Sequence, residues 1–100
     1  MLIDISYRTK QLQKVCEDAS EAKKKYGADM AKKIHQRIDE IRASESVEMM
    51  VKYGIGRCHP LTEDRKGQYA MDLTQPYRLI FEKNGEIVAV EIREIVDYHK

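Results

Sequence analysis

The 100-residue sequence is 42% hydrophobic, so it does not have the composition of a disordered protein, and we expect residues 1–100 to form one domain around one modest core. No apolar run approaches the ~18 residues of a membrane span, and the first residues lack the pattern of a secretion signal, which predicts a cytoplasmic protein with no membrane association. The net charge of +1 argues against a broadly basic nucleic-acid binder, so any RNA site must be a local cluster of cations, or another molecule must present the RNA.

The opening segment predicts a short strand followed by a helix. Ile3 and Ile5 alternate with polar residues, as in a strand with one buried face. Over residues 9–26 the apolar positions recur at steps of three and four, which is the spacing of one helical face. Gly27 is placed to end this helix, so we expect a single helix before it.

A second helix is predicted by the apolar stripe of residues 30–41, and the two helices would form an αα-hairpin. Ser46 is placed to cap a short helical turn that follows. Met49 and Met50 in this turn are expected to fill the core, because methionine adapts to irregular gaps.

The second half of the chain changes to a period of two. Apolar and polar residues alternate over residues 69–73, 77–82 and 87–92, which predicts three strands. Helices followed by strands indicate an α+β fold. We therefore expect two N-terminal helices packed on a mainly antiparallel sheet.

Asn84-Gly85 predicts a two-residue hairpin turn between the last two of these strands, because both central positions of a type I′ turn need positive φ. A turn of this length would place Phe81 opposite Val88 and Arg78 opposite Glu91. The apolar face of the hairpin would then pack on the helices.

The side on which the last residues lie depends on the regularity of the final strand. Without a bulge, Asp97 and His99 would share a face with Arg78. A bulge near Arg93-Glu94 would reverse that side.

Several residues have side chains suited to acid–base chemistry on a phosphodiester. They are His59, Arg65, Lys66, Arg78, Asp97, Tyr98 and His99. Cleavage of RNA by its own 2′-hydroxyl needs a base, an acid and cations that stabilise the charged phosphorane. Histidine, with an ordinary pKa of about 6.5, can be the base or the acid near neutral pH, and this route needs no metal.

Each of these residues also has a structural interpretation. Arg78 could pair with Glu91 across the hairpin. His59 could be a solvated loop residue before a proline, and Arg65-Lys66 could be the exposed face of a turn. The segment of residues 97–99 could be a frayed chain end.

Cys16 and Cys58 are expected to be reduced and buried, as small apolar residues are. Cys58 adjoins His59, but no second close pair of ligands accompanies them, so the sequence does not predict a zinc site. We expect neither a metal ion nor another cofactor.

Three segments carry a family resemblance. Residues 59–69 read His-Pro-Leu and then an acidic-Arg-x-Gly-x-aromatic stretch, residues 77–81 read aromatic-Arg-hydrophobic, and residues 95–99 end in Asp-Tyr-His. In this order, and after two helices, the segments resemble the toxins of the RelE/ParE superfamily, most closely those of HigB type. The resemblance covers nearly the whole chain.

This resemblance implies a RelE-like fold, with two helices packed on a strongly twisted sheet of four to five strands. It also implies a metal-independent endoribonuclease that cuts mRNA in the ribosomal A site and inhibits translation. The implied partners are the ribosome and a cognate helix-turn-helix antitoxin of HigA type. Operator DNA would be contacted only through the antitoxin.

The matching positions imply roles for individual residues. His59 and His99 would be the proton-transfer pair, and Asp97 would orient or tune a histidine. Tyr98 would contact a nucleotide, and Arg78 would hold the scissile phosphate, a task that suits its planar guanidinium. Three further cations are candidates for binding RNA: Arg57, Arg65 and Lys66.

One position departs from the family pattern. Thr62 follows His-Pro-Leu where the family commonly has a lysine, and threonine cannot stabilise a phosphorane by charge. Two alternatives stay open; Thr62 favours the second, and the Asp97-Tyr98-His99 ending argues against the first. The chain could be a non-enzymatic inhibitor of DNA gyrase, like ParE-type toxins, or a weakly active or inactive relative that acts through antitoxin and operator binding.

Overall fold

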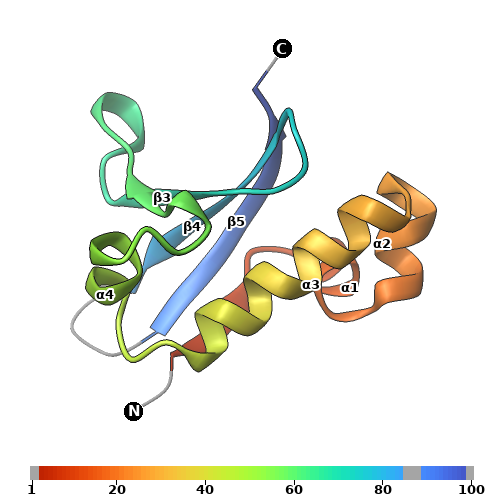
Figure 1. Cartoon of the computed structure of the whole chain (residues 1–100), viewed down its shortest axis with the longest axis horizontal. Coiled ribbons are helices and arrows are strands. Elements are labelled where there is room, and N and C mark those ends of the chain that lie inside the picture. The colour runs from red at the N-terminus through yellow and green to blue at the C-terminus, as the bar shows by residue number, and fades with distance from the viewer. Residues whose placement is uncertain (1–2, 85–88, 99–100) are drawn as a thin grey trace.

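The computed structural model describes residues 3–84 and 89–98. Helices α1, α2 and α3 lie together on one side of a five-stranded sheet, and α4 lies apart from them (Figure 1). The helices are α1 (Lys10–Glu17), α2 (Ala19–Tyr26), α3 (Ala28–Ala43) and α4 (Val47–Lys52), and the short 3₁₀ turns are η1 (Ile55–Arg57) and η2 (Glu63–Arg65). The strands are β1 (Asp4–Tyr7), β2 (His59–Pro60), β3 (Gln68–Asp72), β4 (Tyr77–Lys83) and β5 (Ala89–Asp97).

The sheet has the strand order β1-β5-β4-β3-β2. Strand β1 pairs in parallel with β5, and every other neighbouring pair is antiparallel. The predicted α+β fold with a mainly antiparallel sheet is therefore confirmed. No helix in the described part of the chain is both long enough and apolar enough to cross a membrane.

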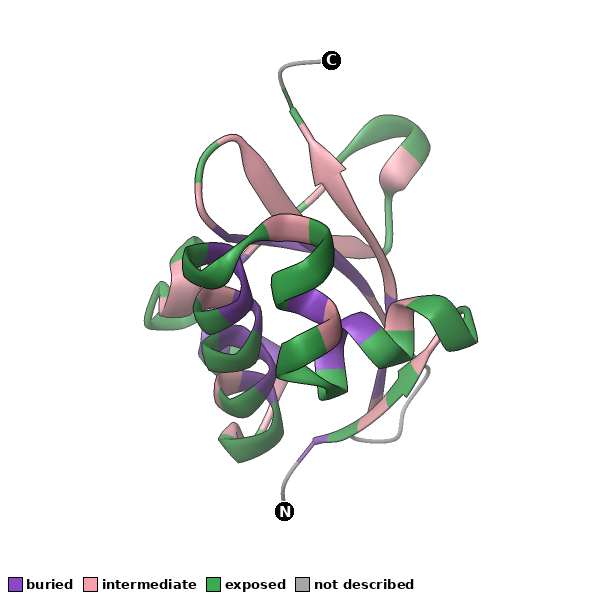
Figure 2. Cartoon of the chain, turned by 90° about the vertical axis from the view of Figure 1, so that its right-hand side faces the viewer, coloured by how far each residue is buried: buried purple, intermediate pink, exposed green. Residues whose placement is uncertain are grey.

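The core lies between the sheet and the helices. Leu79, Phe81 and Ile92 from the sheet are fully buried, and they belong to the same cluster as Ile34 and Ile38 of α3. Figure 2 shows that the helices bury the side that faces the sheet and expose the other side. The face of the hairpin that was predicted to pack on the helices does so.

The predicted first helix is two helices, so the single helix expected before Gly27 is wrong. The chain leaves helical geometry at Asp18, whose φ is −112° and ψ is 107°. The Asp18 side chain accepts a hydrogen bond from the backbone N–H of Ser20 at 2.9 Å and so caps α2. An aspartate competes with the helical backbone in this way, and the apolar spacing does not reveal the competition.

The second helix and the capped turn are confirmed. Helix α3 begins directly after Gly27, and the side chain of Ser46 accepts a hydrogen bond from the N–H of Met49 at 3.1 Å to cap α4. Met50 is completely buried, as expected. Met49 is exposed, so the expectation that it fills the core is wrong, because neighbouring residues of a helix point about 100° apart and only Met50 faces the core.

The predicted register of the last hairpin is wrong. Phe81 lies opposite Ile92, and Arg78 lies opposite Val96. The N–H of Asn84 donates to the carbonyl oxygen of Ala89 at 3.0 Å, so four residues separate this pair and the strands are not joined by a two-residue turn. Residues 85–88, which include the partners predicted at the turn, lie outside the described residues. The partner of Phe81 moves four residues along the strand, from Val88 to Ile92, and an even shift keeps the same side chains on the buried face. The apolar pattern therefore fits both registers and could not distinguish them.

Candidate active site

The face of the sheet opposite the helices carries several of the predicted site residues. Paired residues in an antiparallel sheet point to the same face, so the pairing of His59 with Ala70 and of Ala70 with Ile80 places these three side chains in one row. Asp72 and Arg78 form a second pair on the same face. Ala70 and Ile80 are completely buried, so they form an apolar floor for the polar residues around them.

A bulge in β5 decides which of the last residues join this face. The register shifts opposite Arg93, which leaves that residue without a direct partner on β4. Beyond the bulge, Asp97 lies opposite Tyr77 and therefore on the side of the helices. The arrangement without a bulge, with Asp97 on the face of Arg78, is wrong. Val96 lies opposite Arg78, and the ring of Tyr98 contacts its guanidinium.

Arg78 is held by contacts with two other residues. Its Nε atom lies 3.4 Å from Oδ1 of Asp72, and its guanidinium carbon lies 4.5 Å from the centre of the Tyr98 ring. A guanidinium over an aromatic face gains a cation–π attraction. The expected alternative, a pair with Glu91, is wrong because Glu91 lies opposite Glu82 in the observed register.

Arg57 reaches the same carboxylate from the other side. Its Nε atom lies 3.3 Å from Oδ2 of Asp72, so one carboxylate pairs with two guanidinium groups. The side chain of Asp72 is only 13% exposed, whereas that of Arg57 is 79% exposed. Sequence reasoning missed Asp72. The turn of residues 74–76 was the available signal, since it places Asp72 opposite Arg78 on adjacent strands.

His59 has one ring nitrogen engaged. Its Nδ1 lies 2.8 Å from the carbonyl oxygen of Arg57. A carbonyl oxygen only accepts, so this contact places the proton on Nδ1 and leaves Nε2 as an acceptor in the neutral ring. Strand β2, which carries His59, lies two strands from Arg78, or about 10 Å across the sheet. A substrate in contact with both residues must therefore lie across the face.

The other predicted residues that the structure describes are Arg65, Lys66 and Tyr98, and they differ in their contacts and exposure. Arg65 donates from Nη1 to Glu94 at 2.9 Å and to Gln68 at 3.1 Å, so it fastens the η2 turn to the sheet. Lys66 is exposed directly after that turn. Tyr98 is 43% exposed, and its backbone N–H donates to the carbonyl oxygen of Pro76 at 3.2 Å.

Two of the predicted catalytic residues have no observed role in this arrangement. His99 lies outside the described residues. Asp97 is described and takes part in an interaction within the structure, but on the helix side of β5. The proton-transfer pair of His59 and His99 therefore stays a prediction.

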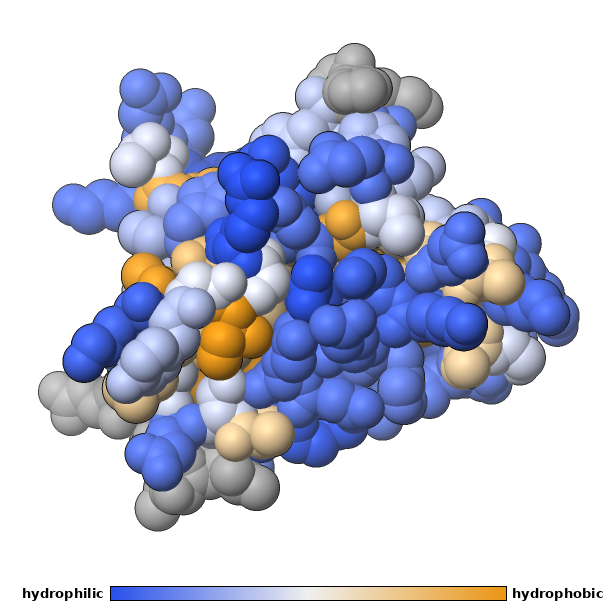
Figure 3. All heavy atoms as spheres, in the orientation of Figure 1, coloured by the Kyte–Doolittle hydropathy of each residue, from blue (hydrophilic) through white to orange (hydrophobic). Residues whose placement is uncertain are grey.

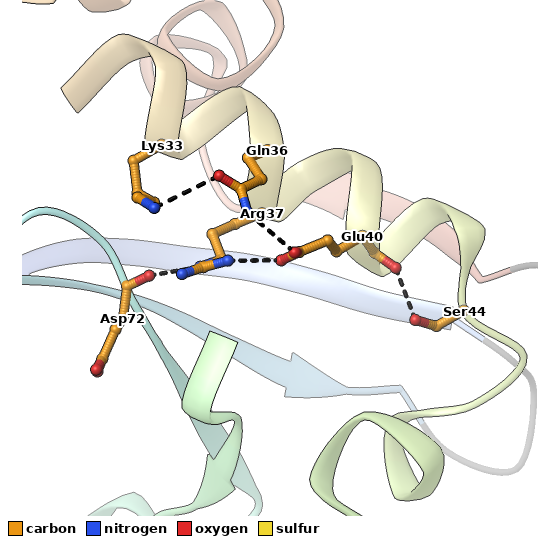
Figure 4. Close-up of polar contacts among 6 residues, drawn as sticks. All are labelled: Lys33, Gln36, Arg37, Glu40, Ser44 and Asp72. Atoms are coloured by element: carbon orange, nitrogen blue, oxygen red, sulfur yellow. Dashed lines mark hydrogen bonds and ion pairs between the residues drawn. The ribbon is translucent and has the colours of Figure 1, made fainter. Parts of the chain in front are cut away.

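A buried arginine supports the backbone beneath the site. Arg37 of α3 donates from Nε to the carbonyl oxygen of Asp72 at 2.6 Å and from Nη1 to Glu40 at 2.8 Å (Figure 4). Figure 4 also shows the side chain of Asp72 extending away from the helix. A Cβ atom added at Gly56 would lie 2.8 Å from Nε of Arg37, so the η1 backbone packs directly on this guanidinium.

Both cysteines are free and buried, as expected. Burial raises the pKa of Cys16 to about 12 and that of Cys58 to about 11. Within residues 3–84 and 89–98, no group of three or more His, Cys, Asp or Glu side chains is arranged to hold a metal ion.

We expect native protein at pH 8 to resist alkylation by iodoacetamide at both cysteines, because the reactive thiolate is suppressed at this pH and each sulfur is inaccessible. Mass spectrometry should show modification at both positions only after denaturation. Rapid labelling of either Cys16 or Cys58 in the folded protein would contradict this expectation.

The comparison with solved structures identifies the architecture. The chain superposes on a YoeB/ParE toxin from Agrobacterium tumefaciens with a TM-score of 0.65 and 17% identity, over 93% of this chain and 95% of that one. A YoeB–YefM complex from Staphylococcus aureus gives a TM-score of 0.63 with 17% identity, over 95% of each chain. A YoeB dimer from the same organism gives 0.62 with 17% identity, over 94% of each chain.

The chain has the RelE/YoeB fold. No protein-family model matches its sequence, and no curated protein does. At 17% identity the likeness establishes the fold alone. The function on this RelE/YoeB fold must therefore be argued from the residues of the outer face.

Proposed function

We propose that this chain is the toxin of a type II toxin–antitoxin system, of HigB type, and that it cuts mRNA on the ribosome without a metal ion. The observation that carries the proposal is the grouping of Arg57, Arg78, Tyr98 and His59 on the outer face of a sheet with the RelE/YoeB fold. These side chains supply cations, a stacking surface and a proton acceptor, which are the groups that RNA cleavage needs.

The chemistry assigns a step to each group. Nε2 of His59 accepts the proton of a ribose 2′-hydroxyl while its oxygen attacks the adjacent phosphorus. Arg78 and Arg57 stabilise the negative charge of the phosphorane. The bond to the 5′-oxygen then breaks, and His99 donates the proton that this leaving oxygen takes up. The products are a 2′,3′-cyclic phosphate and a free 5′-hydroxyl.

The proposal includes protein partners. One structural neighbour is a complex of YoeB with YefM, which supports an antitoxin as the partner of this chain. On the face shown in Figure 3, hydrophobic residues gather on the α4 side, whereas most residues seen over α2 and α3 are hydrophilic. Met49, Tyr53 and Ile55 line an apolar hollow there, and such exposed surfaces are typical of protein contacts. The antitoxin would be a helix-turn-helix protein, and the site of action would be the cytoplasm.

Induced expression in a bacterial host tests the function. We expect growth arrest, and primer extension on abundant messages should show new 5′ ends that recur at fixed positions within codons. Double-strand DNA breaks with intact mRNA would instead establish a ParE-like gyrase inhibitor. Undiminished growth together with binding to a neighbouring antitoxin would establish an inactive relative, and either result would overturn the proposed nuclease.

A further inference from the structure

We propose that Asp72 is a positioning residue, which holds Arg57 and Arg78 so that their terminal nitrogens receive one RNA phosphate. This inference rests on the proposed function, because it assigns the two guanidinium groups to a phosphodiester. The sequence analysis did not single out Asp72, and its role follows from the contacts of its carboxylate.

The geometry of the two ion pairs is the first argument. Each arginine meets Asp72 through Nε, at 3.3 Å for Arg57 and 3.4 Å for Arg78. Among the described residues, neither arginine side chain donates a hydrogen bond, and the ion-pair contact of each with Asp72 is through Nε. The paired edge of each guanidinium is thus turned to the protein, and the terminal nitrogens stay available for phosphate oxygens.

The local charge is the second argument. One carboxylate between two guanidinium groups leaves a net charge of +1, which matches a single phosphodiester. Asp72 also repels the phosphate, because its own negative charge lies beneath the same two cations. It therefore weakens binding of the RNA while it restricts the orientations of Arg57 and Arg78. Removing its charge should strengthen binding and slow the reaction.

The support of the carboxylate is the third argument. Arg37 fixes the backbone of Asp72 through its carbonyl oxygen, and this contact does not involve the carboxylate. A substitution that removes the charge of the side chain therefore leaves the hydrogen bond from Arg37 of α3 in place. This separation makes Asp72→Asn a suitable variant, because the amide keeps the shape of the side chain, removes its charge and replaces one acceptor oxygen by a donor NH2 group.

The test measures binding and cleavage separately. Binding is followed by fluorescence anisotropy with a labelled 2′-O-methyl single-stranded RNA, which lacks the attacking hydroxyl and cannot be cut. Cleavage is followed under single-turnover conditions on ribosomes that carry a defined message. We expect Asp72→Asn to bind the oligonucleotide about three- to tenfold more tightly and to cut at saturation at least about tenfold more slowly. Asp72→Glu should recover part of the rate.

Asp39→Asn is the matched control, since Asp39 is an exposed carboxylate on α3. Unchanged affinity and rate in Asp72→Asn would overturn the inference, and so would a parallel loss of both with a lower melting temperature. If the wild type binds the oligonucleotide and Asp72→Asn binds it more tightly, but neither cuts the message, the anion site stands and the proposed nuclease fails. No binding by the wild type would overturn both.

Discussion

Replacement of Arg78 by alanine is expected to lower the single-turnover rate of mRNA cleavage by about 100- to 1,000-fold and to relieve growth arrest. The guanidinium of Arg78 lies on the outer face between Asp72 and the ring of Tyr98. Loss of one group that stabilises the charge of a transition state has an effect of this size. The rate on ribosomes that carry a defined message is the direct measurement.

Two further variants make this expectation specific. Arg78→Lys should retain part of the rate, because an ammonium group keeps the charge but lacks the planar fork. Arg8→Ala is the control, since Arg8 is exposed just beyond β1 and should leave the rate unchanged. Full toxicity of Arg78→Ala would remove Arg78 from the site, whereas a large loss of thermal stability would indicate a structural role.

Gly56→Ala is expected to lower the free energy of unfolding by roughly 2–4 kcal/mol, which combines left-handed backbone strain with a steric clash. Gly56 has a φ of 59°, and a Cβ atom there would lie 2.8–3.0 Å from the guanidinium of Arg37. Arg37 is buried and paired with both Asp72 and Glu40, so it cannot move aside without losing these contacts. Thermal or urea unfolding measures the loss.

Gly54→Ala separates the two causes. Gly54 also has a left-handed backbone, with a φ of 63°, but nothing lies within 4 Å of a Cβ atom there. We expect the free energy of unfolding of this variant to fall only by the cost of the left-handed backbone, about 1–2 kcal/mol. In a domain of this size, each kcal/mol lowers the melting temperature by roughly 4–8 °C. Equal losses in the two variants would show that the packing of Gly56 on Arg37 has no effect on stability.

The sequence by itself was sufficient for the fold class and for most of the core. A period of two over residues 77–82 and steps of three and four along residues 30–41 are local properties, and they already indicate which side chains are buried. The capping role of Ser46 and the end of a helix at Gly27 are local in the same sense, because each depends on hydrogen bonds or backbone angles within a few residues.

The tertiary structure alone decided which distant residues meet. Asn84-Gly85 is a strong local turn signal, yet the strands pair in a different register, with Phe81 opposite Ile92. Both registers bury the same apolar face, so the alternation of the sequence did not distinguish them. That register, together with the bulge at Arg93, places Tyr98 beside Arg78, and the packing of η1 brings Arg57 to Asp72. Residue spacing encodes contacts within one element, whereas the site on the outer face forms from partners chosen by packing across the whole sheet.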